Sequence, residues 1–341
     1  MKILISALEP SANLHLKSIL EKDSLRELSK FGIFDPKLGK PNFSSNEFNV
    51  MGIFSIIPKI LKARKVITKL INIAKDMDKI LLIDSPAFNI PLAKKIKERY
   101  PEKKIIYYIL PKVWAWKEGR KKLVEKYIDT QISIFPFEKE YYPNSQYFGN
   151  PLLEEITNYR DEVLKNGNIA FLAGSRKNEI KNLMPIFRKV VKKIGEKAIL
   201  VIPPHIEDFS IYGDISEFEI SRDTKDTLIK SEFAFICSGT ATLESAIIGT
   251  PFTLLYKTNP IEFFIGRMFV KLENIGLANI IFNKLNIKDK FHKEFLQNID
   301  ISELLKEKRD IDSSKFLENS KRLREILKGD FYKGVLAEIK A

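Results

Sequence analysis

The stretch FAFICSGTATLESAIIGTP, from Phe233 to Pro251, decides the fold of this chain. Its first residues, Phe233–Cys237, are all apolar and predict a buried strand. Ser238-Gly239-Thr240 follows at once, and a helical pattern begins at about Ala241. A buried strand that passes through such a short loop into a helix is typical of Rossmann-like folds. The backbone N–H groups at the start of the helix suit a phosphate or diphosphate.

Two interpretations of this loop are open. Glu244, one helical turn further on, has a carboxylate that can accept hydrogen bonds from a ribose diol. Alternatively, Ser238 or Thr240 only caps the helix, and Glu244 is its capping-box partner. A second loop of the same kind, Gly174-Ser175-Arg176, follows the expected strand Asn168–Leu172 and adds a cation. The repetition favours a site for the phosphates of a nucleotide.

Strands and helices alternate along the rest of the chain. Besides the two strands already named, strands are expected at Lys2–Ala7, Lys79–Asp84, Lys104–Ile109, Thr130–Phe135, Ala198–Ile202 and Glu217–Ile220. Helices are expected to start at about Asn13, Ser85-Pro86 and Asn178. This alternation predicts an α/β fold with two doubly wound parallel sheets. Ligands bind such sheets at the carboxyl ends of the strands.

The turn Gly149-Asn150-Pro151 separates two such halves and is the expected domain boundary. The predicted organisation is a Rossmann-like domain over residues 1–150 and a second over residues 151–312, whose two phosphate-type loops suit a nucleotide. Charged amphipathic helices over 313–341 can pack back on the first domain. Two such domains that face each other place their ligand in the cleft between them.

The composition limits the class of protein. The chain has 341 residues, 44% of them hydrophobic, and a formal net charge of +13, which indicates a folded protein that attracts anions. The lysines are scattered and have no aromatic residues interleaved with them, so nucleic acid is not an expected partner. A single cysteine, Cys237, excludes an intramolecular disulfide and fits a reducing compartment. Neither a signal peptide nor a membrane-spanning segment is expected.

Several stretches carry a resemblance to a known family, and they occur in the family's order. They are VMGIFSIIPKI, IDSPAFNIPL, YYILPKVWAWKEGRKK, FPFEKEYY, FLAGSRKNEI, CSGTATLESAIIGTPFTLLYK and FVKLENIGLANII, with KEFLQ after them. VWAW and SGTATLE are the most distinctive. The chain resembles the lipid-A-disaccharide synthase family of GT-B glycosyltransferases over most of its length, from about Val50 to Gln297.

The resemblance implies an inverting transfer of 2,3-diacylglucosamine from UDP-2,3-diacylglucosamine to 2,3-diacylglucosamine 1-phosphate. The product is a β-1,6-linked disaccharide 1-phosphate, and neither a metal nor a cofactor is expected. His205 and His292 have no partners at metal-ligand spacing, in agreement with that expectation. The alternative is another GT-B enzyme, a UDP-sugar transferase or epimerase that acts on a non-lipid substrate.

Asp84 is the expected catalytic residue, because it ends a predicted strand and matches the aspartate of the family's I-D-x-P stretch. A carboxylate there can take the proton of an acceptor hydroxyl as that oxygen attacks the sugar carbon. Capping of the next helix is the structural alternative for Asp84, although Ser85 is better placed for that role. His15 is the rival base, although a lone histidine in a first helical turn is more often structural.

The resemblance also suggests residues that hold the two sugars. Arg176 matches the arginine of the family's G-S-R stretch and is expected to bind the diphosphate. The expected donor residues are Ser175, Arg176, Ser238, Gly239, Thr240, Glu244, Asn279 and Gln297, and the acceptor candidates are Glu9, Ser11, Asn89 and Trp116. Trp116 and its neighbour Trp114 either contact a sugar face or fill the core.

The first loop departs from the family pattern A-G-E-x-S-G-D. It reads Ala7-Leu8-Glu9-Pro10-Ser11-Ala12-Asn13, so both glycines and the aspartate are missing. The loop therefore lacks the close backbone approach that glycine permits. Ala87 and Asn150 likewise stand where the family has an acidic residue and a histidine.

Two segments suit contact with a membrane surface. Ile56–Met77 interleaves apolar residues with cations, and Glu262–Leu272 has a similar, shorter pattern. The residues expected at the surface are Lys59, Lys62, Lys65, Lys69, Phe264 and Arg267. A core-facing helix with a solvated basic face is the alternative for each segment. We expect a cytoplasmic chain that anionic lipid holds on the inner face of the bacterial inner membrane, and a homodimer is compatible with the sequence.

Overall fold

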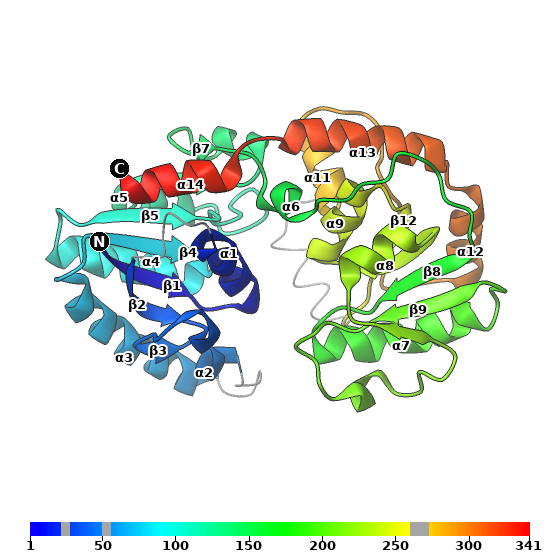
Figure 1. The fold of residues 1–341 in the computed structure, drawn as a ribbon, viewed down its shortest axis with the longest axis horizontal. Helices are drawn as coiled ribbons and strands as arrows, with labels where there is room; N and C mark the ends of the chain where they lie inside the picture. Colours follow the sequence, from blue (N-terminus) through cyan, green and yellow to red (C-terminus); the bar gives the residue numbers. More distant parts are fainter. Residues whose placement is uncertain (22–27, 50–55, 260–272) are drawn as a thin grey trace. The chain divides into compact units, whose positions relative to one another are not determined.

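The computed structural model describes residues 1–21, 28–49, 56–259 and 273–341. They form two compact units, one of Met1–Pro151 with Gly329–Ala341 and the other of Leu152–Lys328. Each unit is a parallel sheet with helices packed on it (Figure 1). The α/β class and the two parallel sheets expected from the sequence are therefore confirmed.

The sheet of the first unit has the strand order β3-β2-β1-β4-β5-β6-β7, and its neighbouring strands are parallel. The strands are β1 (Lys2–Ala7), β2 (Ser29–Phe34), β3 (Phe43–Ser44), β4 (Lys79–Ile83), β5 (Lys104–Tyr108), β6 (Thr130–Ser133) and β7 (Gln146–Tyr147). The helices are α1 (Pro10–Leu20), α2 (Asn46–Asn49), α3 (Ile56–Ala74), α4 (Pro86–Arg99), α5 (Arg120–Tyr127) and α14 (Phe331–Lys340), with short 3-10 turns at Pro36–Leu38 and Pro136–Glu140.

Different helices cover the two faces of this sheet, because side chains alternate along each strand. Leu4 and Leu82 pack among side chains of α3 and α4, whereas Ile5 and Ile83 pack among those of α1 and α14. Helix α14 comes from the far end of the chain and lies over this unit (Figure 1). The core of the first unit is therefore incomplete without the last helix of the sequence.

The sheet of the second unit has the order β10-β9-β8-β11-β12-β13, again with parallel neighbours. The strands are β8 (Asn168–Leu172), β9 (Lys197–Val201), β10 (Glu219–Ser221), β11 (Phe233–Cys237), β12 (Phe252–Tyr256) and β13 (Glu294–Leu296). The helices are α6 (Pro151–Glu155), α7 (Lys177–Val191), α8 (Thr224–Lys230), α9 (Thr240–Ile248), α11 (Leu277–Lys284), α12 (Ile301–Asp310) and α13 (Ser313–Leu327), with a 3-10 turn at Phe209–Tyr212.

Helix α9 is the centre of a helical layer in the second unit, where it contacts α8, α11 and α13, while α7 and α12 pack with β8 and β11 in a second cluster. The segment 313–341 was expected to be one set of C-terminal helices. The structure divides it: α13 packs on α9 in the second unit, whereas α14 belongs to the first. The division falls at Gly329, where an added Cβ would lie within 3 Å of the backbone of Phe148 and Gly149.

Three of the expected strands, β4, β5 and β9, end one residue early, and the ends of β4 and β5 have the same cause. Asp84 and Ile109 were expected to be the last residues of β4 and β5, but their φ angles are +49° and +62°. Positive φ is the left-handed region, which a strand cannot include. The backbone therefore turns away from the sheet at these two residues.

Candidate functional site

Each sheet reverses its strand order at one point, and the loops at that point are where ligands of open parallel sheets bind. In the first unit the reversal lies between β1 and β4, which are followed by Glu9 and by Asp84-Ser85. In the second unit it lies between β8 and β11, which are followed by Gly174–Arg176 and Ser238–Thr240. The structure thus brings the expected catalytic residue to one switch point and the expected phosphate loops to the other.

Asp84 is held through its backbone in a conformation that few residues adopt. It and Ser85 have φ angles of +49° and +45°, and two consecutive left-handed residues other than glycine are strained. The carbonyl oxygen of Asp84 accepts hydrogen bonds from Asn89 Nδ2 at 2.7 Å and from the Tyr107 hydroxyl at 2.8 Å. Its N–H donates to the Tyr108 carbonyl oxygen at 3.0 Å. The half-buried side chain of Asp84 is therefore attached to a backbone whose N–H and carbonyl groups are both held by hydrogen bonds.

Asn89, expected to contact the acceptor, is instead fully buried beneath this turn. Besides Asp84, its Nδ2 donates to the Ile83 carbonyl oxygen at 3.1 Å, and its Oδ1 accepts from the Ser6 hydroxyl at 2.6 Å. These bonds use the amide within the protein, so Asn89 is a positioning residue.

Tyr107 is a site residue that the sequence did not reveal, because it reads as one more apolar position of β5. Burial raises the pKa of its phenol well above the usual value, and the charge of Asp84 raises it further. The hydroxyl therefore stays protonated and remains a donor to the Asp84 carbonyl oxygen. Only the three-dimensional structure shows its role, because it places the Tyr107 hydroxyl at the carboxyl end of the strand next to β4.

The first loop, which lacks the family's glycines, is fixed by Asn13. The buried side-chain amide of Asn13 donates to the carbonyl oxygens of Ala7 and Glu9, each at 3.0 Å, and its Oδ1 accepts from the Asp35 N–H at 2.7 Å. An aspartate at this position could accept but not donate. The Ser85 hydroxyl lies 3.5 Å from Glu9 Oε1, so the loops after β1 and β4 meet.

Ser85 begins α4 as expected, with Pro86 as the first helical residue, but its side chain makes no capping hydrogen bond. The Ser11 side chain is exposed in the first turn of α1. His15, the rival base, packs edge-on against Tyr108 with 5.6 Å between ring centroids. Tyr108 belongs to the cluster on the α1 and α14 face, whereas Tyr107, which bonds to Asp84, belongs to the opposite face. His15 therefore packs on the α1 and α14 face of the sheet, whereas the Tyr107 hydroxyl reaches Asp84 from the other face.

In the second unit, the N-terminus of α9 has no side-chain cap among the described residues. Gly239 occupies the N-cap position, Thr240 begins the helix, and both are exposed. A Cβ added at Gly239 would meet nothing within 4 Å. The interpretation of Ser238 or Thr240 as a cap with Glu244 as its partner is therefore wrong, and among the described residues no side chain caps the first backbone N–H groups of α9.

The neighbouring loop needs its glycine. Gly174 has a φ of +91°, and a Cβ there would lie 2.5 Å from Glu179 Oε2 and 3.1 Å from Cys237 Sγ. Glu179 accepts from the Arg176 N–H and pairs with its guanidinium at 2.7 Å. Arg176 thus stands beside the exposed Ser175 at the start of α7, with a largely exposed side chain. The close contact of Gly174 with Cys237 shows that the loops after β8 and β11 adjoin.

Glu244 is half-buried in α9, four residues after Thr240 and therefore on the same helical face. Burial raises the pKa of its carboxyl group, Lys225 opposes the shift, and the charge of Glu155 adds to it. A carboxyl group in such surroundings favours a hydrogen-bonded partner over water.

Of the other two expected donor residues, Asn279 is buried in the second unit, whereas Gln297 lies at the end of a strand. Asn279 is buried; its Nδ2 donates to the His292 carbonyl oxygen at 2.9 Å and to Glu294 Oε1 at 2.8 Å, and its Oδ1 accepts from Phe291 N at 2.8 Å. It therefore joins α11 to β13. Gln297 lies at the carboxyl end of β13, has a φ of +64°, and accepts from the Thr258 N–H at 3.0 Å.

The two tryptophans of VWAW have different roles. Trp114 is buried, and its Nε1 donates to Glu138 Oε1 at 3.0 Å. Glu138 also accepts from the N–H groups of Ile134 and Phe135, and burial raises the pKa of its carboxyl group. Trp116 is 44% exposed and is therefore not part of the core.

Helix α3, part of the segment expected to contact a membrane, has most of its described apolar residues in the core and its described cations mostly at the surface. Ile67, Leu70 and Ile71 of α3 are buried in the core, which contradicts an apolar face directed at lipid along this part of the helix. Lys65 and Lys69 are exposed, while Lys62 pairs with Glu47 at 2.7 Å. The Lys59 side chain and the segment with Phe264 and Arg267 lie outside the described residues.

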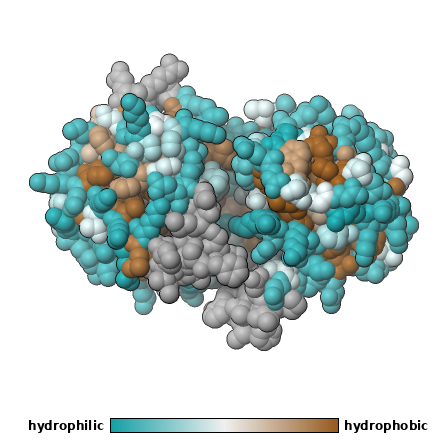
Figure 2. Space-filling model, turned by 90° about the horizontal axis from the view of Figure 1, so that it is seen from below, coloured by the Kyte–Doolittle hydropathy of each residue, from teal (hydrophilic) through white to brown (hydrophobic). Residues whose placement is uncertain are grey.

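Hydrophilic residues predominate on the face seen in Figure 2, with smaller hydrophobic areas between them. Among the described helices, none combines the length and apolar character that crossing a membrane requires. Within the same described ranges, no three His, Cys, Asp or Glu side chains come together as a ligand set for a metal ion.

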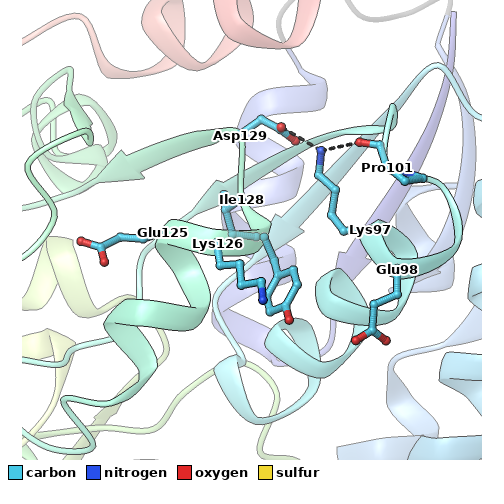
Figure 3. Close-up of a pocket in the computed structure, with 8 residues that line it drawn as sticks. Lys97, Glu98, Pro101, Glu125, Lys126, Ile128 and Asp129 are labelled. Atoms are coloured by element: carbon cyan, nitrogen blue, oxygen red, sulfur yellow. Dashed lines mark hydrogen bonds and ion pairs between the residues drawn. The ribbon is translucent and has the colours of Figure 1, made fainter.

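A hollow of about 470 Å³ lies in the first unit, at the end of the sheet away from the switch-point loops (Figure 3). Lys97 points across it and donates to Asp129 at 2.8 Å and to the Pro101 carbonyl oxygen at 3.2 Å. Pro101 and Asp129 precede β5 and β6, so the hollow is at the amino ends of the strands. It is separate from the loops of the switch point.

The fold is that of the GT-B glycosyltransferases. Over 99% of both chains, the structure resembles that of Acinetobacter baumannii MurG, with a TM-score of 0.60 at 12% sequence identity. A likeness at this identity establishes the architecture alone.

Similarity in sequence identifies the family. The family model described as Lipid-A-disaccharide synthetase matches residues 3–329. The lipid-A-disaccharide synthase of Campylobacter jejuni (strain RM1221) is 46% identical over 316 residues, 86% of each chain. That of Helicobacter pylori (strain Shi470) is 44% identical over 345 residues, 95% of this chain and 94% of the relative. The chain belongs to the lipid-A-disaccharide synthetase family and is a glycosyltransferase that uses a UDP-sugar. These likenesses do not favour an epimerase or a transferase with a non-lipid substrate.

Proposed function

We propose that this enzyme transfers 2,3-diacylglucosamine from UDP-2,3-diacylglucosamine to 2,3-diacylglucosamine 1-phosphate and forms a β-1,6-linked disaccharide. The observation that carries the proposal is the fixed turn at Asp84, at the switch point of the first sheet. The names of the relatives and the two phosphate-type loops of the second unit support it.

In this reaction Asp84 takes the proton from the 6-hydroxyl of the acceptor. The hydroxyl oxygen attacks the anomeric carbon of the donor from the side opposite UDP, a new C–O bond forms, and the bond to the diphosphate breaks. UDP leaves with the electron pair of that bond, and the configuration at the anomeric carbon inverts. A positioned general base of this kind contributes about 100-fold or more to the rate.

The leaving diphosphate gains negative charge as its bond breaks, and the second unit holds groups that offset such charge. They are the uncapped N–H groups at the start of α9 and the guanidinium of Arg176. Glu244 is on the α9 face that leads away from the phosphates, where it can accept from the ribose hydroxyls. Because these cations and donors belong to the protein, we propose that the reaction requires no metal.

The lipid substrates imply a place of action. We propose that the enzyme works at the inner face of the bacterial inner membrane, where the exposed cations of α3 are attracted to anionic lipid. The buried Ile67 and Leu70 limit this contact to charge in the described part of the helix.

The test is a transfer assay with purified enzyme, both diacylated substrates and mass spectrometry of the product. The expected product is the disaccharide 1-phosphate, formed at the same rate with and without a chelator. Release of UDP with a non-acylated acceptor at the same rate would instead favour the non-lipid alternative. Loss of activity on chelation, restored by a divalent ion, would contradict metal independence.

A further inference from the structure

The segment that follows β5 leaves the sheet beside Asp84. β5 is the neighbour of β4, and the Asp84 N–H donates to the carbonyl oxygen of Tyr108, the last residue of β5. The segment is then anchored by Trp114, which is buried and bonded to Glu138. Residues 115–120 are therefore the partly to fully exposed continuation of a segment with a fixed origin.

Trp116 is an unusual surface residue because two cations lie over its ring. Lys117 Nζ is 4.3 Å and the Arg120 guanidinium carbon 5.5 Å from the ring centroid. The ion pair found on the same helix as Arg120 joins Lys121 to Glu125, and none in the described part of the chain involves Lys117 or Arg120. An exposed aromatic face with two cations that no carboxylate among the described residues pairs with suits a ligand that has both a ring face and an anion.

The charge of Arg120 reaches the Asp84 turn. Burial and the charge of Asp84 raise the pKa of Tyr107, and the guanidinium of Arg120 opposes that shift. Arg120 has the same effect on Tyr142, whose hydroxyl donates to the Pro111 carbonyl oxygen at 2.8 Å. Arg120 is therefore close to the carboxyl end of β5, on the side of the sheet where Tyr107 meets Asp84.

We propose that Trp116, Lys117 and Arg120 form the subsite for the anionic group of the acceptor, its phosphate monoester. The inference rests on the proposed function and names the residues that select a phosphorylated acceptor. The reacting hydroxyl is on C6 and the phosphate is on C1 of the acceptor sugar, so a base at Asp84 that contacts the hydroxyl leaves the phosphate to a separate cationic site. A guanidinium matches two phosphate oxygens at once, and the indole face can cover the sugar.

The test compares Arg120→Gln, Lys117→Gln and Arg120→Lys with the parent, and Lys122→Gln is the matched control. Lys122 is an exposed cation on the same helix with no contact to the Trp116 ring. For each, kcat/KM is measured with the phosphorylated acceptor and with the same acceptor lacking phosphate. The preference for phosphate should fall about tenfold or more in Arg120→Gln, less in Arg120→Lys, and not in Lys122→Gln, while the KM for the UDP-sugar stays unchanged.

A second measurement separates this inference from the proposed reaction. Binding of soluble glucosamine 1-phosphate and of glucosamine is titrated in the absence of donor. Weaker binding of the phosphorylated sugar alone by Arg120→Gln supports the subsite even if the transfer assay fails. An unchanged preference for phosphate in both assays overturns it. So does a loss of binding to anionic vesicles with an unchanged preference, because the surface would then contact lipid head groups instead.

Discussion

The side-chain amide of Asn89 holds the backbone of Asp84, with 2.7 Å between Asn89 Nδ2 and the Asp84 carbonyl oxygen. Two consecutive left-handed residues cost on the order of 1–3 kcal/mol each. Hydrogen bonds from Asn89 and Tyr107 to one carbonyl oxygen offset part of that cost. A strained turn kept in place by buried donors fixes the backbone from which the Asp84 side chain projects, which suits the general base proposed for this residue.

Replacement of Asp84 by Asn should remove the proposed base and keep a side chain of nearly the same size and shape. We expect kcat to fall about 100-fold or more, because no carboxylate takes the proton of the acceptor. Binding of the UDP-sugar, measured by titration, should be unchanged because the donor loops belong to the other unit.

Near-normal turnover of Asp84→Asn would exclude this residue as the base. His15→Gln is the comparison variant, because His15 packs against Tyr108 on the α1 and α14 face of the sheet. Its turnover should stay within a few-fold of the parent.

Asn89→Ala tests the positioning role. The substitution removes the donors to the carbonyl oxygens of Ile83 and Asp84 and leaves the buried Ser6 hydroxyl without its partner. We expect a loss of about 2–3 kcal/mol in the free energy of unfolding and a lower kcat. Urea unfolding and steady-state kinetics measure the two effects.

Ser6→Ala is the matched control for Asn89→Ala. It removes the partner of Asn89 Oδ1 but keeps both donor bonds to the turn. Its stability should fall by about 1 kcal/mol with kcat almost unchanged. Equal effects of the two variants on kcat would show that Asn89 acts only through stability.

The sequence predicted the parts of this fold that have a strong local pattern. The runs at β1, β4 and β11 are continuous apolar stretches, and their positions were found to within a residue. Strands β2, β3, β7, β12 and β13 were missed. SKFGIF of β2 is only partly apolar, and β3, β7 and β13 have two or three residues, so pairing with neighbouring strands stabilises them without a strong pattern of their own. FTLLY of β12 has a clear apolar pattern and was overlooked.

The same distinction applies to the site. Asp84 and Ser238-Gly239-Thr240 were predictable because each follows a buried strand directly. Asn89 was predicted to contact the acceptor, whereas it is buried and bonded to Asp84, and Tyr107 was not identified. Both act on Asp84 from neighbouring elements, and such a relationship depends on the register of β4 with β5.

Arg176→Ala should weaken binding of UDP. A charge-assisted hydrogen bond contributes about 1.5–3 kcal/mol, so the dissociation constant should rise roughly 10- to 100-fold. Lys177→Ala removes the same charge one residue further on and should have a much smaller effect. Equal losses of UDP affinity in the two variants would indicate a general effect of positive charge instead of a specific contact with Arg176.

His292 should make stability depend on pH. Burial lowers its pKa to about 3, and its Nε2 has no hydrogen-bond partner among the described residues. In the unfolded chain His292 is protonated near pH 6.5, whereas in the folded chain it is protonated only near pH 3. This group's contribution to stability is thus complete above pH 6.5 and decreases as the pH falls toward 3, by up to about 1.4 kcal/mol per pH unit.

His292→Leu should flatten that dependence. Urea midpoints measured between pH 7.5 and pH 4 should change less with pH in this variant than in the parent. His205→Gln, at an exposed histidine, is the control and should keep the slope of the parent. An equal slope in parent and His292→Leu would mean that His292 takes up its proton in the folded chain as readily as in the unfolded one.

The last prediction concerns the basic face of α3. Arg64, Lys65 and Lys69 are exposed there, whereas Lys62 is engaged by Glu47. Each exposed cation is worth about 1 kcal/mol near an anionic surface, so replacing the three by Gln should weaken binding to anionic vesicles roughly 100-fold at low salt. Salt screens the attraction, and the difference from the parent should shrink as ionic strength rises. Turnover on detergent-dispersed substrate should barely change, because Ile67, Leu70 and Ile71 still hold the helix in the core. Replacing Lys189, Lys192 and Lys193, which are exposed on and after α7, removes the same charge from the second unit. If that control loses as much vesicle binding as the α3 variant, net charge alone explains the attraction and α3 has no special role.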